Sequence, residues 1–357
     1  MRLLLFSANF GSGHLQAARA VAQAHRALHP ENEAIILNMN DPLMWLIAEG
    51  YLRLLRWAPG LYRLLYGSPA SPLLNQVIQV VWRLTCLKAI ARHRPDVVVA
   101  THPFPGLALA ELRQRGDLTQ PVHAIVTDWE AHTLWLHQGF DHYFVAAPAT
   151  RRGFEAQGIP AARITVTGIP VRPAFGQAVV KRHGRSVLVM GGGLGLGPIT
   201  KATRSLAALP QPDLQVTVVC GQNGDLYREL TEHVAADPRF TILGYDDAIH
   251  ELMAKADLLL TKPGGISSAE ALVMGLPLLL LAPLPGQEEE NAAHLVETGA
   301  ARPVATDRIG RQVRELLFED QGALAAMQAA AYAAGRPRSA DLIANHLKAV
   351  NQVGSPA

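Results

Sequence analysis

Two stretches decide the fold: Met1-Arg-Leu-Leu-Leu-Phe-Ser-Ala-Asn-Phe-Gly-Ser-Gly-His14 and Ser186-Val-Leu-Val-Met-Gly-Gly-Gly-Leu-Gly-Leu-Gly197. Each begins with a short apolar run, typical of a buried parallel strand, that leads directly into a glycine-rich loop. Glycine permits positive φ and close approach of a ligand, and free N–H groups at the start of the next helix attract anions. Because this beginning occurs twice, the sequence predicts two α/β domains that face each other across a cleft.

Apolar runs alternate with longer helical stretches along the whole chain, as in parallel sheets covered by helices. The predicted strands are 2–7, 34–39, 96–101, 122–127, 142–146 and 163–167 in the first half, and 186–191, 215–220, 239–243, 257–261, 277–281 and 301–304 in the second. A segment with two prolines follows the sixth strand and is typical of an interdomain linker. We therefore expect a first domain over 1–170, a linker over 168–177, a second domain over 178–335, and a C-terminal helix and tail over 336–357, with helical structure throughout 311–350.

Composition limits the function classes. The chain has 357 residues, 49% hydrophobic and 17% charged, which is enough for two ordinary globular domains. Cys86 and Cys220 are far apart and have no metal-ligand spacing, which argues against a zinc site or a disulfide framework. No run reaches the roughly 18 apolar residues that span a bilayer, and 3–6 is too short for a signal-peptide core. We expect a cytoplasmic protein whose membrane contact, if any, is peripheral.

Segment 41–67 does not fit the alternation of short apolar strands and longer helices. It combines aromatic side chains (Trp45, Tyr51, Trp57, Tyr62 and Tyr66) with three arginines (Arg53, Arg56 and Arg63). Amphipathic aromatics beside a basic face are typical of an interfacial helix on an anionic lipid surface. The alternative is an ordinary surface helix that packs its aromatics into the first domain.

The first glycine loop differs from a dinucleotide fingerprint, because Gln16 occupies the third glycine position. This weakens a dehydrogenase interpretation. His14 stands where the loop enters its helix, and the helix dipole favours the neutral imidazole that a general base requires. A capping or loop-bonding role is the structural alternative.

In the second half, Lys262-Pro-Gly-Gly-Ile-Ser-Ser-Ala-Glu270 follows a strand and opens a helix. Ser267 or Ser268 can cap this helix, and Glu270 can accept hydrogen bonds from two ribose hydroxyls or serve only as a cap. After the next strand, the polar residues Gln287, Glu288 and Asn291 stand at the sheet edge where ligands bind.

Together these residues resemble the monogalactosyldiacylglycerol synthase and processive diacylglycerol glucosyltransferase family, within glycosyltransferase family 28. The matching pieces are Gly11-Ser-Gly-His14 with Ala17-Ala18, Ala58-Pro-Gly-Leu-Tyr62 with Leu65-Tyr66, Thr101-His-Pro-Phe104, Val126-Thr-Asp-Trp-Glu-Ala-His132 with Trp135, Thr167-Gly-Ile-Pro170, Met190 to Gly193, Cys220-Gly-Gln-Asn223, and Lys262 to Glu270 with Gly286-Gln-Glu288 and Asn291. The resemblance implies two facing, Rossmann-like, doubly wound α/β domains of the GT-B type, an inverting reaction, and neither a bound metal nor a cofactor other than the UDP-sugar substrate.

The resemblance also implies roles for individual residues. His14 matches the general base, and Asp128 can orient His14 or act as the base itself. The implied donor-binding residues are Gly13, Gly192, Gly193, Asn223, Tyr245, Lys262, Gly264, Gly265, Ser267, Glu270, Gln287, Glu288 and Asn291. The implied acceptor or membrane residues are Trp45, Arg53, Arg56, Trp57, Tyr62, Arg63, His132 and Trp135.

The implied activity is transfer of a hexose from a UDP-sugar to a lipid hydroxyl, with diacylglycerol as the first candidate acceptor. The implied partners are the UDP-sugar, the lipid and an anionic membrane surface on the cytoplasmic side, without nucleic acid. Three alternatives remain open: N-acetylglucosaminyl transfer to a polyprenyl-linked or other lipid, an epimerase that acts on UDP-N-acetylglucosamine, and a catalytically silent nucleotide-sugar sensor. Glucose, galactose and N-acetylglucosamine all remain candidate donor sugars.

Overall fold

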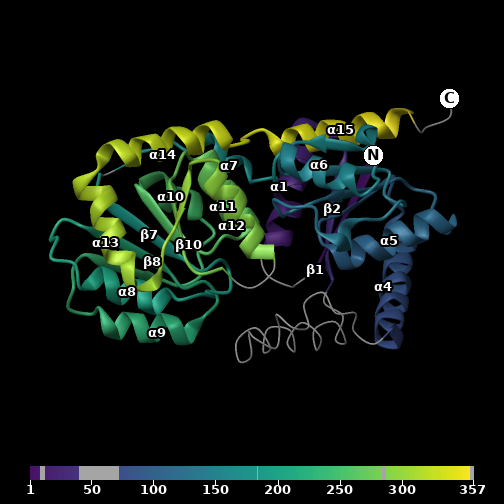
Figure 1. Ribbon diagram of the computed structural model, residues 1–357. Coiled ribbons are helices and arrows are strands. Elements are labelled where there is room, and N and C mark those ends of the chain that lie inside the picture. Colours follow the sequence, from purple (N-terminus) through teal and green to yellow (C-terminus); the bar gives the residue numbers. More distant parts are fainter. Residues whose placement is uncertain (9–12, 40–71, 183, 284–286, 354–357) are drawn as a thin grey trace. The chain divides into compact units, whose positions relative to one another are not determined.

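The computed structural model describes residues 1–8, 13–39, 72–182, 184–283 and 287–353, and contacts within the chain divide it into two compact units. The first unit comprises the described residues up to Pro173, together with Gln287 and those from Arg338 onward. The second comprises the described residues from Ala174 to 283, and Glu288–Pro337. Each unit is built on a six-stranded parallel sheet, which confirms the predicted two-domain α/β fold (Figure 1).

The sheet of the first unit has the strand order β2-β1-β3-β4-β5-β6. Its strands are β1 (Arg2–Ala8), β2 (Glu33–Met39), β3 (Val97–Ala100), β4 (Val122–Ile125), β5 (His142–Val145) and β6 (Ile164–Val166). The chain runs outward from β1 to β2 and then returns to add β3 on the other side of β1. The order of the strands therefore reverses between β1 and β3.

The sheet of the second unit has the order β12-β11-β10-β7-β8-β9. Its strands are β7 (Ser186–Met190), β8 (Gln215–Val219), β9 (Phe240–Leu243), β10 (Leu258–Thr261), β11 (Leu278–Leu280) and β12 (Ala301–Pro303). Here the reversal lies between β7 and β10. All twelve predicted strands are confirmed, with ends that differ by one or two residues, because strands covered on both faces have continuous apolar runs.

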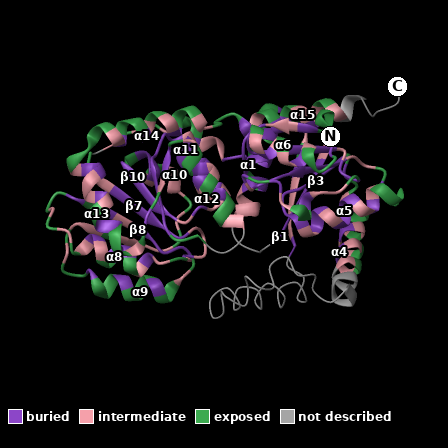
Figure 2. Ribbon diagram, in the orientation of Figure 1, coloured by how far each residue is buried: buried purple, intermediate pink, exposed green. Residues whose placement is uncertain are grey.

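Helices cover both faces of the first sheet (Figures 1 and 2). They are α1 (Gly13–Leu28), α4 (Pro72–His93), α5 (Pro103–Arg115), α6 (Pro148–Ala156) and α15 (Ser339–Val353), with 3₁₀ turns η1 (Thr133–Trp135) and η2 (Ala161–Arg163). Leu4 and Phe6 of β1 pack in one core with Trp82 of α4, whereas Leu3 and Leu5 pack in another with α1 and α15. The alternation of β1 side chains thus fills a core on each face.

The C-terminal helix α15 belongs to the first unit, although the chain reaches it from the second. It packs along α1, where Ala340 and Ala344 meet Ala20 and Ala24. Small side chains permit this close approach of two helices. The predicted helical region 311–350 is confirmed over most of its length, and it is interrupted at Asp320 and between Ala334 and Ser339.

The second unit also carries helices on its sheet, with a core formed by β7, β8, β10 and β11 against α8, α9, α13 and α14. Its helices are α7 (Pro173–Gln177), α8 (Ile199–Ala207), α9 (Gly224–His233), α10 (Ile249–Lys255), α11 (Gly265–Val273), α12 (Gln287–Glu297), α13 (Ile309–Arg314) and α14 (Gln321–Ala334), with the 3₁₀ turn η3 (Thr306–Arg308) and the π-helical turn η4 (Glu315–Glu319). Two helices are divided by this assignment, since Pro173 of α7 and Gln287 of α12 group with the first unit.

The same hydrogen-bonding arrangement recurs at the amino ends of several strands. An aspartate just before a strand accepts a hydrogen bond from the first N–H of the neighbouring strand: Asp96 from Arg2 at 2.6 Å, Asp141 from Val122 at 2.7 Å, and Asp257 from Ser186 at 2.9 Å. Such bonds satisfy backbone donors at the sheet edge and fix the register of neighbouring strands. The carboxyl ends of the same strands are thereby aligned at the opposite edge.

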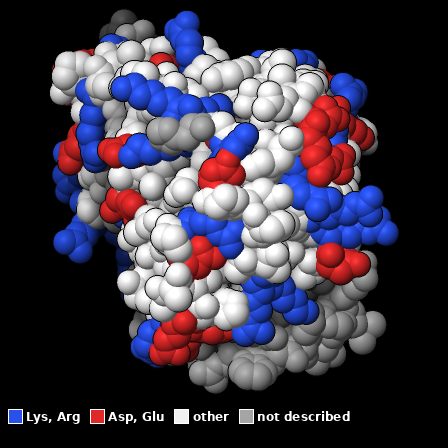
Figure 3. Space-filling view, turned by 90° about the vertical axis from the view of Figure 1, so that its left-hand side faces the viewer, with Lys and Arg blue, Asp and Glu red and all other residues white. Residues whose placement is uncertain are grey.

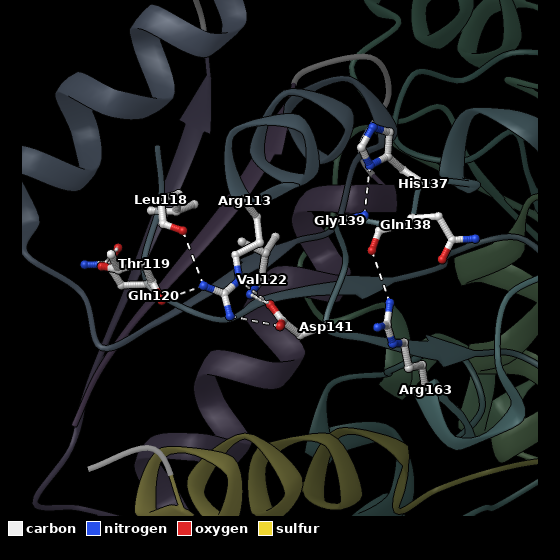
Figure 4. A network of polar contacts seen from close by, with 10 residues as sticks. All are labelled: Arg113, Leu118, Thr119, Gln120, Val122, His137, Gln138, Gly139, Asp141 and Arg163. Atoms are coloured by element: carbon white, nitrogen blue, oxygen red, sulfur yellow. Dashed lines mark hydrogen bonds and ion pairs between the residues drawn. The ribbon is translucent and has the colours of Figure 1, made fainter. Parts of the chain in front are cut away.

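Arg113 adds further contacts to this hydrogen-bonding arrangement at β4 and β5 (Figure 4). Its guanidinium pairs with both carboxylate oxygens of Asp141, with distances of 3.0 and 3.1 Å, and donates to the carbonyl of Thr119 at 2.8 Å. A two-pronged arginine–carboxylate pair is stronger and more directional than a single contact. The C-terminal end of α5 is thus tied to the amino ends of two strands.

Charged side chains of both signs lie beside one another on the face that Figure 3 shows. Surface ion pairs of the second unit include Arg204–Glu229 at 3.5 Å, Arg228–Asp225 at 2.5 Å and Arg314–Glu319 at 2.9 Å. Exposed pairs of this kind contribute about 0–1 kcal/mol each to stability. Mixed charge on this face does not favour attraction of a strongly charged partner.

Candidate functional site

In the first unit, the reversal of strand order brings two predicted motifs together. β1 leads to His14 in the first turn of α1, and β3 leads to Thr101 and His102 just before α5. Ligands of open α/β sheets bind at the carboxyl ends of the strands where the order reverses. The predicted position of His14 at the entry to a helix is confirmed.

His14 is held through one ring nitrogen. Its Nδ1 lies 2.7 Å from the carbonyl oxygen of Thr101 and 3.0 Å from Oγ1 of Thr127. A carbonyl oxygen can only accept, so the contact with Thr101 places the ring hydrogen on Nδ1. Nε2 then carries the lone pair and can accept a proton.

The environment of His14 keeps its ring neutral. Burial lowers the pKa of His14 to about 4, against the opposing effect of the hydrogen bond to Thr101. His102 lies edge-on to it, with ring centroids 4.3 Å apart, and its Nδ1 accepts the Phe104 N–H at 3.2 Å. Burial and the neighbouring His14 also hold the pKa of His102 well below its usual value. A neutral imidazole is the form that acts as a base at neutral pH.

The predicted acceptor-side residues have different environments. Asp128 is partly buried in the loop after β4, next to Thr127. His132 caps η1, with Nδ1 accepting the Leu134 N–H at 3.2 Å, and burial lowers its pKa. Within the described residues, no three His, Cys, Asp or Glu side chains form a group that could hold a metal ion.

Trp135 requires a correction. It was expected to face the acceptor or the membrane, but its side chain is fully buried in the core of the first unit beside Phe140. Gly106 of α5 permits this packing, because a Cβ there would lie 3.1 Å from the indole ring. Trp135 therefore stabilises the loop that carries the motif and does not line its surface.

The other predicted membrane residues (Trp45, Arg53, Arg56, Trp57, Tyr62 and Arg63) lie within 40–71, outside the described residues. Their predicted interfacial role remains a prediction. In the part of the chain that is described, no helix has the length and apolar character needed to cross a membrane.

The second unit has its own glycine loop at the reversal between β7 and β10. Gly192 and Gly195 have φ of +69° and +60°, a region that favours glycine. The turn after β8 supports this loop: Gln222 N–H donates to the carbonyl of Gly193 at 2.9 Å, and Asn223 Nδ2 donates to the carbonyl of Gly195 at 3.4 Å. Asn223 also caps α9 by accepting the Leu226 N–H at 3.1 Å. The loop is therefore fixed before any ligand arrives.

Lys262 extends from the end of β10 toward this glycine loop. A Cβ built on Gly192 would lie 3.7 Å from its Cε, and a Cβ built on Gly264 would lie 3.7 Å from its Nζ. The ammonium forms an ion pair with Oε1 of Glu288 in the first turn of α12. Several predicted donor-binding residues thus lie together in one unit.

The start of α11 differs in one detail from the prediction. No side chain caps this helix, whose N-cap is Gly264, and the Ser268 hydroxyl donates backward to the Gly264 carbonyl at 2.8 Å. The expected serine cap is therefore wrong, because Ser268 already lies inside the helix. Ser267 is partly buried in the first turn that Gly265 opens.

Glu270 and Asn291 are both largely buried near this turn, with exposed fractions of 6% and 2%. Asn291 Nδ2 donates to the carbonyl of Pro263 at 3.1 Å, which ties α12 to the loop after β10. Tyr245 is 45% exposed after β9, with its hydroxyl 3.1 Å from Oδ1 of Asp247. Gln287 is the first residue of α12, and Gly13 is the first of α1.

Two contacts of the site were not predicted. The Thr101 carbonyl and the Thr127 hydroxyl both hold His14, and both belong to motifs that the sequence analysis singled out. The motifs themselves were visible in the sequence and indicated that these residues belong to the site. A sequence does not show which backbone atom points toward a side chain.

Comparison with known proteins agrees with this geometry. Residues 14–171 match the family model described as monogalactosyldiacylglycerol (MGDG) synthase, and residues 186–343 match the glycosyltransferase family 28 C-terminal domain. The chain is 31% identical over 375 residues to a processive diacylglycerol beta-glucosyltransferase of Bacillus cereus strain AH820, with 99% of this chain and 94% of that protein covered. The protein of the same name from Bacillus thuringiensis strain Al Hakam is 30% identical over the same coverage.

Solved structures show the same fold at low sequence identity. The S. aureus MnaA–UDP co-structure has a TM-score of 0.69 at 15% identity and covers 100% of this chain and 99% of that one. Acinetobacter baumannii MurG has a TM-score of 0.61 at 18% identity, with 98% and 100% covered. Anabaena Alr3699/HepE in complex with UDP and glucose has a TM-score of 0.57 at 15% identity, with 98% and 99% covered.

Proposed function

Because the chain belongs to the family of monogalactosyldiacylglycerol synthases and processive diacylglycerol glucosyltransferases, we propose that it transfers a hexose from a UDP-sugar to diacylglycerol with inversion. The chain is a UDP-sugar-dependent hexosyltransferase with a family 28 C-terminal domain. The acceptor, the donor sugar and the stereochemistry belong to the proposal.

The observation that carries the mechanism is that His14 is hydrogen-bonded through Nδ1. With its hydrogen held on Nδ1 by Thr101, Nε2 takes the proton of the acceptor hydroxyl. The acceptor oxygen forms a bond to the anomeric carbon as the bond from that carbon to the diphosphate oxygen breaks. One base and one displacement invert the anomeric centre.

The leaving UDP carries the electron pair of the broken bond. N–H groups of the Gly192–Gly193 loop, the start of α11 and the Lys262 ammonium would stabilise its negative charge. Glu270 would accept hydrogen bonds from the ribose, while Gln287, Glu288 and Asn291 would address the transferred sugar. This chemistry uses groups of the chain and requires no additional cofactor.

We place the acceptor on a membrane surface, at the first unit. The support is the basic excess of residues 51–100, where seven Lys or Arg oppose only Asp96, together with the aromatic side chains of segment 41–67. Anionic lipids attract such a surface, and the aromatics add buried apolar area. Peripheral binding at a cytoplasmic membrane face is the resulting proposal.

Incubation of the purified protein with UDP-glucose, UDP-galactose or UDP-N-acetylglucosamine and diacylglycerol vesicles tests the proposal. Mass spectrometry should show a hexose added to the diacylglycerol, and NMR of the product should show inverted anomeric configuration. Polyprenyl phosphate vesicles provide the competing acceptor. A change in the UDP-sugar itself, with no lipid product, would instead support the epimerase alternative.

A further inference from the structure

The ion pair between Lys262 and Glu288 stands between two separate segments of the second unit. Lys262 directly follows β10, whereas Glu288 lies 26 residues later in the first turn of α12. The exposed fractions of the two side chains are 18% and 13%. Water therefore screens this pair far less than it screens pairs on the open surface.

The side chain of Lys262, which forms this ion pair, also lies close to the glycine loop. A Cβ built on Gly192 would lie 3.7 Å from Cε of Lys262, and a Cβ built on Gly264 would lie 3.7 Å from its Nζ. No other described atom outside the residues next to each glycine lies within 4 Å of either Cβ. Two glycine turns thus open toward the same lysine side chain. A diphosphate held by N–H groups of these turns would lie against Lys262.

We propose that the Glu288 carboxylate holds Lys262 as a counter-ion and that the donor diphosphate displaces it. This inference rests on the proposed function, because it takes the Gly192 loop as the diphosphate site. Carboxylate and diphosphate are both anions that need the ammonium, so they compete for it. Binding of the diphosphate therefore has to open the contact between Lys262 and Glu288.

Displacement has a consequence for recognition of the sugar. The first-turn position on α12 stabilises the Glu288 carboxylate as an anion after it leaves Lys262. Its oxygens then become available to accept hydrogen bonds from donor hydroxyls. Glu288 thus contributes to sugar specificity in a second step. It forms hydrogen bonds with the sugar only after the diphosphate has bound the Lys262 ammonium.

Calorimetric titration of the full chain with UDP tests the competition. Glu288→Gln should bind UDP about 5- to 30-fold more tightly than wild type, a factor that corresponds to about 1–2 kcal/mol. Glu289→Gln is the matched control, because it removes the same charge from the neighbouring exposed residue, and its UDP affinity should stay within about twofold of wild type. Lys262→Met should weaken UDP binding by about 10- to 100-fold and leave uridine binding unchanged.

The double variant Lys262→Met/Glu288→Gln separates competition from a general charge effect. If Glu288 acts through Lys262, the tighter binding caused by Glu288→Gln disappears in the Lys262→Met background. Equal gains in both backgrounds, equal gains for Glu288→Gln and Glu289→Gln, or unchanged UDP affinity in Glu288→Gln would each overturn the inference. Wild type that does not bind UDP at all would overturn the proposed donor class itself. Glu288→Ala, with its thermal unfolding measured, provides the same test if the glutamine variant folds poorly.

Discussion

Nδ1 of His14 lies 2.7 Å from the carbonyl oxygen of Thr101, and this contact decides which ring nitrogen carries the hydrogen. When Nε2 takes a proton, the ring becomes a cation whose Nδ1–H still points at the carbonyl oxygen. The carbonyl dipole then stabilises the charge that develops during the reaction. Because β1 and β3 are neighbours in the sheet, the base and its orienting oxygen are fixed by the same backbone pairing.

Substitution of the proposed base provides the first test. His14→Ala should lower turnover by about two to four orders of magnitude, the usual contribution of a positioned general base. UDP affinity should change little, because the proposed UDP contacts come from the second unit. Turnover and calorimetric UDP binding are the two measurements. Near-normal turnover in His14→Ala would move the base role to Asp128.

The hydroxyl of Thr127 should support His14 through Nδ1. Thr127→Val removes this hydroxyl at nearly constant volume and should lower kcat by about 2- to 12-fold, with KM unchanged, because one net hydrogen bond contributes about 0.5–1.5 kcal/mol. Thr127→Ser should restore the rate. Imidazole ¹⁵N chemical shifts of His14 would report the ring tautomer directly.

A matched control for Thr127 lies in the same unit. The Thr165 hydroxyl also contacts a histidine, with 2.8 Å between its Oγ1 and Nε2 of His142. Thr165→Val should alter stability without changing kcat. If Thr127→Val lowers kcat equally in the His14→Ala background, Thr127 does not act through His14.

The carboxylate of Glu270 should contribute to nucleotide affinity. Glu270→Ala should weaken UDP binding by about 1–3 kcal/mol, because a charged acceptor for the ribose hydroxyls is lost. The same variant should bind ribose-free pyrophosphate as wild type does. Calorimetry with both ligands separates the ribose contact from a general disturbance of the site, and unchanged UDP affinity would remove Glu270 from it.

The strands were predictable because each depends on a local apolar pattern, whereas the order of the strands in each sheet was not predicted. Parallel strands covered on both faces have continuous apolar runs, and their carboxyl ends carry the motifs with His14, Thr101 and Lys262. A sequence pattern therefore places these residues at the correct sheet edge. It does not show which atoms meet there.

Contacts that depend on tertiary packing were not predictable in the same way. Trp135 belongs to a motif with polar residues, yet its side chain packs beside Gly106 and is completely buried. Ser268 can serve as a cap in sequence, but the helix begins at Gly265 and the hydroxyl turns back to Gly264. The packing of α15 on α1 depends on alanines more than 300 positions apart in the chain, which no local period reveals.

The buried histidines of the first unit should make the protein sensitive to acid. Burial lowers the pKa of His123 to about 3 and that of His142 to about 4, and their like-charged neighbours act in the same direction. His346 of α15 lies 4.3 Å from His142 between ring centroids, while Asp141 opposes and Arg113 reinforces the shift at His123.

The sign follows from proton binding. Below about pH 6.5 the unfolded chain takes up protons that the folded chain resists, so the free energy of unfolding falls as pH falls toward 4. Each such histidine should contribute a slope of up to about 1.4 kcal/mol per pH unit. Urea unfolding at pH 7.5, 6.5, 5.5 and 5.0 measures the slope, and His123→Phe should reduce it. Constant stability between pH 7.5 and 5.0 would contradict the buried, neutral state of these rings.

The arginines of segment 41–67 provide the test of membrane binding. If Arg53, Arg56 and Arg63 face anionic lipid, each contributes about 1 kcal/mol near the surface, and replacement of all three by glutamine should release the protein from anionic vesicles. Activity on vesicle-borne acceptor should fall, whereas activity on a short-chain soluble acceptor should persist. High salt should imitate the substitution, because the attraction decays over about 10 Å at 0.1 M. Vesicle flotation of wild type and the triple variant at low and high salt measures the effect, with vesicles of neutral lipid as the control. Equal flotation of both proteins at low salt would assign the segment to packing against the first domain and leave the lipid acceptor supported by family membership alone.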